Sequence, residues 1–187
     1  EKGVWPSNYL SNHDSRRQVT YYGNDKEYRK ESAKLLAVLN NTVPGNVYMY
    51  QGEEIGMTNV RYSSIADHNC CYTVGDYHSM VANGSTPEEA LDWVAPRSRD
   101  NARTPYQWDS TKNAGFSDGT PWLKVNPNYT EINVADQLQR EDSILNYYRK
   151  LVALRKREDV IRDGEYTEIL PERLDVIAYT RKNADRI

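Results

Sequence analysis

The sequence has no long hydrophobic run, no excess of positive charge and only two cysteines. Because no stretch approaches the roughly 18–20 apolar residues of a membrane-spanning helix, we predict no membrane partner. No charged start followed by an apolar stretch indicates a secretory signal. Lys and Arg number 24 against 27 Asp and Glu, which gives a formal charge of −3. That balance lacks the basic footprint of nucleic-acid binding, so we predict no nucleic-acid partner.

The two cysteines, Cys70 and Cys71, are adjacent in the sequence. Neighbouring cysteines rarely form a disulfide with each other, because the bond needs Cβ atoms that are separated and face each other. Reduced thiols are the rule in the cytoplasm, which we therefore predict as the location of the protein.

The chain does have length and aromatic side chains. Its 187 residues suffice for one domain, or for one domain and part of another. Phenylalanine occurs once, but 15 tyrosines and 4 tryptophans argue against a disordered protein, which would be short of aromatics. The chain starts at Glu1 without a Met and stops just after a strand-like run, so we expect a piece of a longer protein.

The first sixty residues alternate between strand and helix patterns. An apolar and aromatic run from Val4 to Leu10 predicts a strand that stops at a polar loop, residues 11–14. Apolar side chains at near-helical spacing predict a helix over 27–41, and residues 47–50 predict a second, buried strand. Strand, helix and strand in this order form a βαβ unit, which implies a parallel sheet or barrel.

The middle of the chain is less regular. Residues 58–82 show weak periodicity and are expected to form a long excursion. Residues 96–135 are so rich in Pro, Gly, Asn and Asp that we expect mostly loop. Between these stretches, Thr86 and Glu89 predict a capping box at the start of a short helix.

The last part of the chain is regular again. Asp142 is the expected cap of a strong helix that ends near Arg157. The expected buried stripe of this helix consists of Ile144, Tyr148, Leu151 and Leu154. Two strands over 166–170 and 174–180 follow, and we place a domain boundary near residue 160.

Side chains that carry chemistry gather first at the end of the first predicted strand. His13 and Asp14 follow it, with Arg17 three residues further on. Catalytic groups in parallel α/β folds and barrels sit at this end of the strands. An Asp beside a His and an Arg stays ionised and is suited to bind hydroxyl groups or a developing positive charge. The alternative is that Asn12 or Asp14 caps the next helix and Arg17 merely pairs with it.

A second group, Gln51-Gly52-Glu53-Glu54, follows the second predicted strand. Carboxylates on neighbouring loops would suit the acid/base pair of a glycosidase if they lie roughly 5–10 Å apart. Nothing in the sequence sets the distance to Asp14. We therefore favour a structural role, in which a glutamate accepts hydrogen bonds from backbone N–H groups.

A third group is the arginine-rich stretch 97–103, which runs on into Tyr106 and Trp108. Guanidinium groups present forks of donors that suit carboxylates and vicinal hydroxyls. Aromatic plates beside them would suit the C–H faces of a sugar. The alternative is a surface cluster of salt bridges.

A fourth group contains potential metal ligands in the stretch 67–71, together with Asp76 and His78. Its spacing matches no zinc pattern, because C-x₂₋₄-C is absent and adjacent thiols chelate poorly. We therefore predict no metal site here and no other cofactor. The competing hypothesis of a metal-dependent enzyme rests on this group alone.

The motifs Tyr9-Leu10-Ser11-Asn12-His13-Asp14, Tyr48 to Asn59 and Arg99 to Asp109 occur in this order. Together they resemble glycoside hydrolase family 13. Within that family the sequence is most similar to the oligo-1,6-glucosidase, α-glucosidase and dextran glucosidase group, which residues 113–116 and 125–129 also fit. The likeness runs over nearly the whole chain.

The resemblance implies a fold and a reaction. Residues 1–160 would be the C-terminal portion of a (β/α)₈ TIM barrel, with strands 7 and 8 and their helices. Residues 161–187 would begin the family's antiparallel β-domain. The reaction would be retaining hydrolysis of an α-1,6 or α-1,4 glucosidic bond at the non-reducing end of a short oligosaccharide.

The resemblance also assigns roles to residues. Asp14 matches the aspartate that stabilises the oxocarbenium-like transition state, and His13 matches a substrate-binding histidine. Arg99 is similar to the arginine that grips the terminal glucose, and Arg103 is a weaker candidate near the next subsite. Glu53 matches part of a structural motif, in agreement with the favoured interpretation of its stretch.

Other family roles match nothing in this chain. The nucleophilic Asp and the acid/base Glu come from the loops after strands 4 and 5, and the calcium loop also lies upstream. We therefore expect the isolated chain to be inactive and to self-associate through strand edges that the missing strands would cover. Ser15-Arg16 replaces the Gln-Pro of many relatives, and Cys70-Cys71 is unusual for the group. Linkage preference, and hydrolysis versus isomerisation, therefore stay open.

A non-catalytic carbohydrate-binding module is the alternative function. Such a module would use the tyrosines and tryptophans of its surface. Binding modules usually show the pattern of a β-sandwich. Because this chain shows a βαβ pattern and two clear helices, we favour the enzyme.

Overall fold

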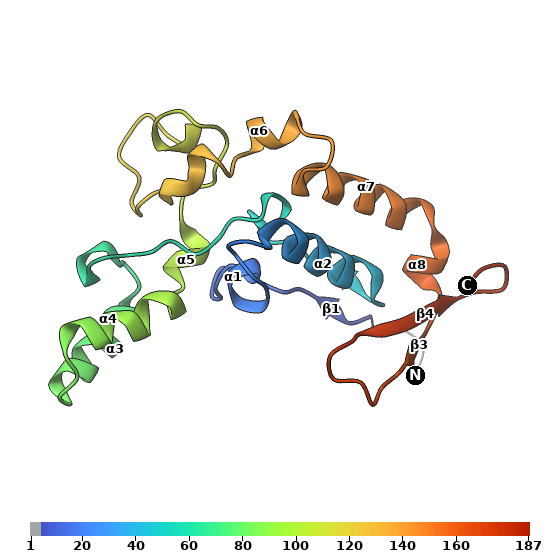
Figure 1. Ribbon diagram of the computed structural model, residues 1–187, viewed down its shortest axis with the longest axis horizontal. Helices are drawn as coiled ribbons and strands as arrows, with labels where there is room; N and C mark the ends of the chain where they lie inside the picture. The colour runs from blue at the N-terminus through green and yellow to red at the C-terminus, as the bar shows by residue number, and fades with distance from the viewer. Residues whose placement is uncertain (1–4) are drawn as a thin grey trace.

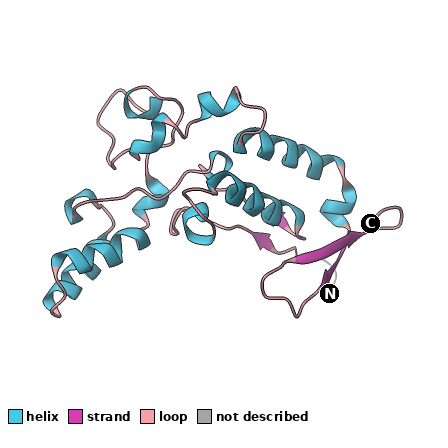
Figure 2. Ribbon diagram, in the orientation of Figure 1, coloured by secondary structure: helices cyan, strands magenta, loops and turns pink. Residues whose placement is uncertain are grey.

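The computed structural model describes residues 5–187, so the predicted start of the first strand, Val4, lies outside the described residues. Within that range, helices predominate and the strands form two small sheets (Figures 1 and 2). The helices and strands are β1 (Ser7–Asn8), α1 (Gln18–Tyr22), α2 (Arg29–Thr42), β2 (Asn46–Val47), α3 (Cys71–Ala82), α4 (Pro87–Val94), α5 (Asp100–Arg103), α6 (Val134–Leu138), α7 (Ile144–Arg157), α8 (Asp159–Asp163), β3 (Glu165–Ile169) and β4 (Ala178–Lys182). Short 3-10 helices lie between them: η1 (Glu53–Ile55), η2 (Ile65–Asp67), η3 (Ala95–Arg97), η4 (Lys112–Gly115) and η5 (Pro127–Thr130).

The βαβ unit at the start of the chain is present. Strand β1 pairs in parallel with β2, with Ser7 opposite Asn46, and α2 lies between the two strands in sequence. Both strands are shorter than predicted. The ladder extends only to the hydrogen bonds that Asn46 and Tyr48 donate to the carbonyl oxygens of Pro6 and Asn8. Beyond these bonds the backbone has no partner in a ladder, so the strands end there.

The main hydrophobic core lies between α2 and α7, which run side by side (Figure 1). Its buried residues are Val19, Ala33, Ala37, Ile144, Tyr148 and Leu151. The predicted stripe of α7 is therefore confirmed, with Leu154 partly buried against the same core. On α2 the small side chains of Ala33 and Ala37 face the core, whereas Leu35 points to solvent. Small residues at these positions let the two helices approach closely.

Both predicted helix starts exist, but one cap is wrong by one residue. The capping box of α4 is formed by Thr86 and Glu89, as predicted. Helix α7 is capped by Ser143, whose hydroxyl accepts a hydrogen bond from the backbone of Asn146 at 3.1 Å. The predicted cap, Asp142, instead pairs with Lys30 on α2. A lysine within reach gives its carboxylate a partner that sequence spacing does not reveal.

Helix α3 lies in the stretch that was predicted to be a long excursion. It packs beside α4, and the two project together from the rest of the molecule (Figure 1). Of its twelve residues only Thr73 is buried. A helix that buries one side chain has no apolar stripe, which explains the weak periodicity of residues 58–82. No helix within residues 5–187 is long and apolar enough to cross a bilayer.

The chain ends in an antiparallel hairpin. Strand β3 pairs with β4 from Glu165 opposite Lys182 to Ile169 opposite Ala178. The first predicted strand is off by one residue, but the second begins four residues later than predicted. Leu174 is fully exposed and belongs to the connecting turn. The domain boundary near residue 160 stays a prediction.

Candidate active site

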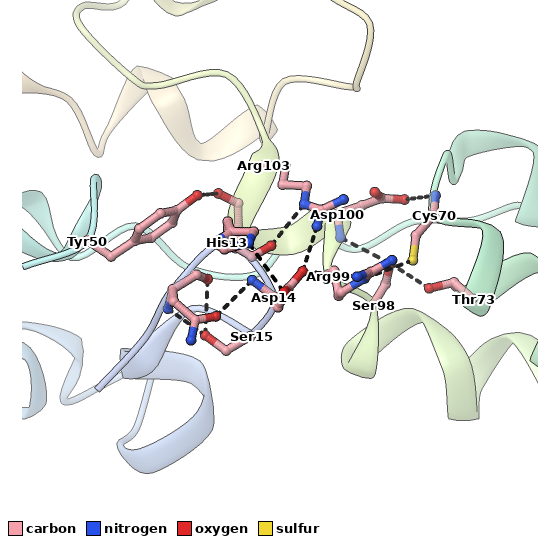
Figure 3. Close-up of polar contacts among 12 residues, drawn as sticks. His13, Asp14, Ser15, Tyr50, Cys70, Thr73, Ser98, Arg99, Asp100 and Arg103 are labelled. Carbon is pink, nitrogen blue, oxygen red and sulfur yellow. Dashed lines mark hydrogen bonds and ion pairs between the residues drawn. The ribbon is translucent and has the colours of Figure 1, made fainter. Parts of the chain in front are cut away.

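The loop that follows β1 is closed by its own polar side chains. The Asn12 side-chain oxygen accepts from the Asp14 backbone N–H at 2.8 Å, and the Asn12 carbonyl accepts from the Ser15 N–H at 3.2 Å. The Ser15 hydroxyl in turn accepts from the Asn12 N–H at 2.8 Å. These bonds fix a tight turn from which His13 and Asp14 project (Figure 3).

The Asp14 carboxylate is the centre of a charged cluster (Figure 3). Its Oδ1 accepts from Arg99 Nη1 at 3.0 Å and from Arg103 Nη2 at 2.8 Å. Its Oδ2 lies 3.3 Å from His13 Nε2. The side chain of Asp14 remains 48% exposed. Desolvation raises the pKa of Asp14, but the opposing effects of His13 and the two arginines are larger together, so its pKa is lowered.

Helix α5 explains why both arginines reach the same carboxylate. Arg99 stands at its N-cap and Arg103 is its last residue, so the two side chains lie one turn apart on one side. The residues between them point inward: Asp100 and Asn101 are fully buried. Asn101 donates to the carbonyls of Ala95 and Ser98 and accepts from a backbone N–H. The buried bonds thus hold the helix that presents the arginines.

Arg103 also fixes the loop that carries Asp14. Its Nε donates to the carbonyl oxygen of His13 at 2.8 Å, while its Nη2 binds the carboxylate. One guanidinium therefore contacts both the backbone and the side chain of the same turn. The structure brings together all four residues that the sequence singled out as site residues, His13, Asp14, Arg99 and Arg103.

Arg17 does not belong to this cluster, which corrects both interpretations of it. It is buried and donates to the carbonyls of Asn101 at 2.9 Å and Gln51 at 2.6 Å, and to Thr104 Oγ1 at 3.2 Å. Neither Asn12 nor Asp14 caps α1, because its N-cap is Arg17 itself. Burial lowers the pKa of Arg17 to about 10. The residue therefore connects the start of α1 to the turn after β2 and to the end of α5.

The glutamates after β2 have structural partners, as favoured from the sequence. Glu54 accepts from the backbone N–H of Gly52 at 2.8 Å and from the Tyr106 hydroxyl at 2.7 Å. Glu53 accepts from the Ser11 hydroxyl at 2.5 Å and is buried. Burial raises the pKa of Glu53 to about 7, although the bond from Ser11 opposes the shift. Gly52 has a φ of +94°, and a Cβ there would lie 2.7 Å from Arg17 Nη1.

Of the two aromatic residues expected to face a sugar, only one is accessible. Trp108 is 52% exposed, whereas Tyr106 is buried and stacks against it at a centroid distance of 4.6 Å. Tyr106 therefore packs in the interior and is not a sugar platform. Its hydroxyl is committed to Glu54.

The potential metal ligands of residues 67–71 are used in other ways. His68 is buried, stacks on Tyr62 and lies 3.2 Å from the Ser98 hydroxyl. Cys71 is exposed, whereas Cys70 is buried, and both are free. In residues 5–187 no three His, Cys, Asp or Glu side chains converge as a metal site would require.

Sequence reasoning missed two neighbours of Arg99. Its Nε lies 3.3 Å from Cys70 Sγ, and its guanidinium stacks over the ring of Tyr72 at 4.6 Å. Both come from the start of α3, the helix that the sequence pattern did not predict. No local signal in the sequence connects residues 70–72 with residue 99.

Comparisons with known proteins show which family this chain resembles in sequence and structure. The model of the family "Alpha amylase, catalytic domain" matches residues 1–164. An oligo-1,6-glucosidase of Parageobacillus thermoglucosidasius is 49% identical over 178 residues, which are 95% of this chain and 32% of that protein. A crystal structure of Bacillus licheniformis trehalose-6-phosphate hydrolase superposes with a TM-score of 0.94 at 42% identity, covering 98% of this chain and 33% of that one. A trehalulose synthase structure gives 0.91 at 44% identity over 96% of this chain and 33% of its own.

The matched family model and relatives thus define one class of carbohydrate-active proteins. The chain belongs to the alpha-amylase catalytic domain family, glycoside hydrolase family 13. It spans about a third of the length of the relatives it matches.

Proposed function

We propose that this chain forms part of a retaining α-glucosidase that hydrolyses α-1,6 or α-1,4 bonds at the non-reducing end of short oligosaccharides. The observation that carries the proposal is the Asp14 carboxylate in the loop after β1, which Arg99 and Arg103 hold. The similarity of the chain to an oligo-1,6-glucosidase supports the choice of substrate class.

In this proposal Asp14 stabilises the positive charge that develops on the sugar in the oxocarbenium-like transition state. A carboxylate that stays ionised suits that role, and the lowered pKa of Asp14 keeps it ionised. His13 and Arg99 offer donors to the hydroxyls of the terminal glucose, and Arg103 lies beside the next subsite. The exposed half of the Asp14 side chain leaves room for a sugar to approach.

We propose that β1 and β2 are strands 7 and 8 of a (β/α)₈ barrel and that residues 161–187 begin an antiparallel β-domain. The parallel pairing of β1 with β2 and the hairpin of β3 with β4 support this division. The large side chains of Tyr9, Tyr48 and Met49 beside the first sheet are about half exposed. Further strands would cover them, and without these strands the chain would self-associate.

A family member needs a nucleophile and a general acid besides the transition-state stabiliser. No residue of this chain matches the family's motifs for either, so the isolated chain is expected to be inactive. A carbohydrate-binding module remains the second candidate. The charged cluster around Asp14 gives no reason to prefer a binding module over an enzyme. The cytoplasmic location stays a prediction.

The test is an assay of the full-length protein that carries these residues. It should release glucose from isomaltose, maltose and p-nitrophenyl α-glucoside, and NMR should detect α-glucose as the first product. First release of β-glucose, or no turnover of any of the three, would contradict the proposal. The relative rates on isomaltose and maltose give the linkage preference, and the products formed from sucrose separate hydrolysis from isomerisation.

The isolated chain serves as the second arm of this assay. Residues 1–187 alone should turn over none of the three substrates. Titration with isomalto- and malto-oligosaccharides should show no tight binding. Robust turnover would refute the need for carboxylates from outside the chain, and tight binding without turnover would favour the binding module.

A further inference from the structure

The guanidinium of Arg99 has three partners, and Figure 3 shows two of them, Asp14 and Cys70. Its Nη1 binds Asp14 Oδ1 at 3.0 Å, its Nε donates toward Cys70 Sγ at 3.3 Å, and its face lies on Tyr72 at 4.6 Å. An arginine side chain has several rotatable bonds, so one ion pair at a half-exposed carboxylate does not fix it. A second fixed partner limits these rotations.

Cys70 is fixed in place without help from Arg99. Its backbone N–H donates to Asp100 Oδ2 at 2.9 Å, and the same oxygen accepts from the Asn69 N–H at 2.8 Å. Asp100 is fully buried and Cys70 is 3% exposed. Since Cys70 is also the N-cap of α3, its sulfur sits at the positive end of a helix of twelve residues.

The surroundings of the Cys70 sulfur favour its ionised form, the thiolate, which is a stronger hydrogen-bond acceptor than the thiol. Burial raises the pKa of Cys70, but hydrogen bonds from the backbone and side chain of Thr73 and from Arg99 outweigh it, so the pKa is lowered. Four charged or titratable groups besides Arg99 lie around this region, on α3, η3, α5 and the loop before α3: Asp76, Arg97, Asp100 and His68. Of these, Asp76 and Arg97 line the same cavity as the thiol and carry opposite charges, so the donors to the sulfur are Thr73, Tyr72 and Arg99.

Arg99 has room to move if the sulfur is lost. Cys70, Tyr72 and Arg99 line a cavity of about 210 Å³ between the start of α3 and the end of α4. Without an acceptor for its Nε, the guanidinium can swing into this space and away from Asp14. Packing alone does not prevent this, because the cavity is open beside the side chain.

We propose that Cys70 is a positioning residue, whose sulfur binds Arg99 Nε and so holds Arg99 Nη1 on the carboxylate of Asp14. The effect on turnover rests on the proposed function, whereas the contact between Cys70 and Arg99 does not. The neighbouring Cys71 is exposed and offers a matched control.

The first experiment is a double-mutant cycle in the full-length protein. Cys70→Ala should lower kcat/KM on p-nitrophenyl α-glucoside about tenfold, the value of one hydrogen bond to a charged group. Cys70→Ser, which keeps an acceptor, should recover part of this loss, and Cys71→Ala should stay within about twofold of the parent. The Arg99→Lys protein lacks the Nε that binds the sulfur. In that protein, adding Cys70→Ala should lower kcat/KM by less than about twofold.

A tenfold loss in both backgrounds would show that Cys70 acts through packing alone and would overturn the proposal. An unchanged kcat/KM for Cys70→Ala in the protein that retains Arg99 would also overturn the proposal. Thermal unfolding midpoints of all variants, measured in parallel, separate a displaced arginine from a protein that fails to fold.

The second experiment does not need enzymatic activity, so it stands if the proposed function fails. Thiolate absorbance near 240 nm, taken as the difference between Cys71→Ser and Cys70→Ser/Cys71→Ser proteins, follows the ionisation of Cys70. Adding Arg99→Lys to both should raise the pH midpoint by about one unit or more, because the thiolate loses one of its donors. An unchanged midpoint, or a thiol that does not ionise below pH 9, would refute the contact.

Discussion

Two groups of carboxylates and arginines lie at the loops that follow the two strands of the first sheet, and they differ in burial and in hydrogen-bond partners. After β1, Asp14 is half exposed and meets Arg99 and Arg103. After β2, Glu53 is buried and binds Ser11, while Arg17 nearby donates mainly to backbone carbonyls. The same residue types thus produce an accessible charged site in one place and an internal brace in the other.

The difference lies in what each group would lose by changing partners. The exposed ion pairs around Asp14 are screened by water and exchange easily for the hydroxyls of a ligand. The buried donors of Arg17 have no water to replace their carbonyl partners, so their removal leaves unsatisfied polar atoms. We therefore expect the first cluster to govern activity and the second to govern stability, and the following predictions test this division.

The largest expected effect concerns activity. Asp14→Asn removes the charge that the proposed function places at the transition state but keeps the shape of the side chain. It should lower kcat of the full-length protein on the order of 10³-fold with little change in the thermal unfolding midpoint. A kcat near that of the parent would refute the role of Asp14. A large drop in the thermal unfolding midpoint would contradict the division between a cluster for activity and a cluster for stability.

The second effect concerns stability. Arg17→Met keeps the apolar stem and removes every donor, which leaves the carbonyls of Asn101 and Gln51 without their partner. We expect a loss of about 3–5 kcal/mol, to be measured by denaturant unfolding. The control is Arg16→Met, because Arg16 stacks on Tyr21 at 4.1 Å and should cost under about 1 kcal/mol. Equal losses for the two variants would remove the special role of Arg17.

The third effect is a dependence of stability on pH. The pKa of Glu53 rises from 4.5 to about 7 on burial, so between these values the folded state binds more protons than the unfolded state. Stability from this group is fully present below pH 4.5 and is lost as pH rises through about 7, by about 3 kcal/mol in all. Unfolding midpoints at pH 5 and pH 8 measure the loss. Glu53→Gln should flatten this dependence, and an unchanged slope in that variant would disprove the assignment.

The smallest effect concerns a single hydroxyl in the buried cluster. Tyr106→Phe removes the hydrogen bond to Glu54 at 2.7 Å and should cost about 1–2 kcal/mol of stability. Tyr129→Phe is the matched control, since its hydroxyl makes no hydrogen bond within residues 5–187. If the two variants unfold at the same denaturant concentration, the bond contributes nothing measurable.

The sequence was sufficient to predict the βαβ unit, the helices α2, α4 and α7, and the position of His13 and Asp14 after a strand, because each has a local pattern in the sequence. Apolar residues at spacings of three and four predict α7, and the position of Asp14 just after a strand indicates a candidate site. Helix α3 leaves no such mark, because it buries only Thr73. The partners of Arg17 could not be predicted either, since backbone carbonyls are the same at every position of a sequence.

The pairing of Asp14 with Arg99 and Arg103 was the least predictable part of the site. The residues are 85 or more positions apart, and Arg17 stands much closer in sequence. Spacing favoured the nearer arginine, but the fold buried it. Only the resemblance to a family selected Arg99 and Arg103 before the structure did.

The single turn of α5 has a consequence for how this protein can vary. An α-helix advances by about 100° per residue, so inserting or deleting one position between Arg99 and Arg103 would rotate one arginine toward the interior and one buried polar residue toward solvent. The charged cluster around Asp14 and the buried hydrogen bonds of Asn101 would be lost together. The number of residues in this turn is therefore as fixed as their identity, whereas a loop such as 117–120, which is exposed throughout, can change length without disturbing either.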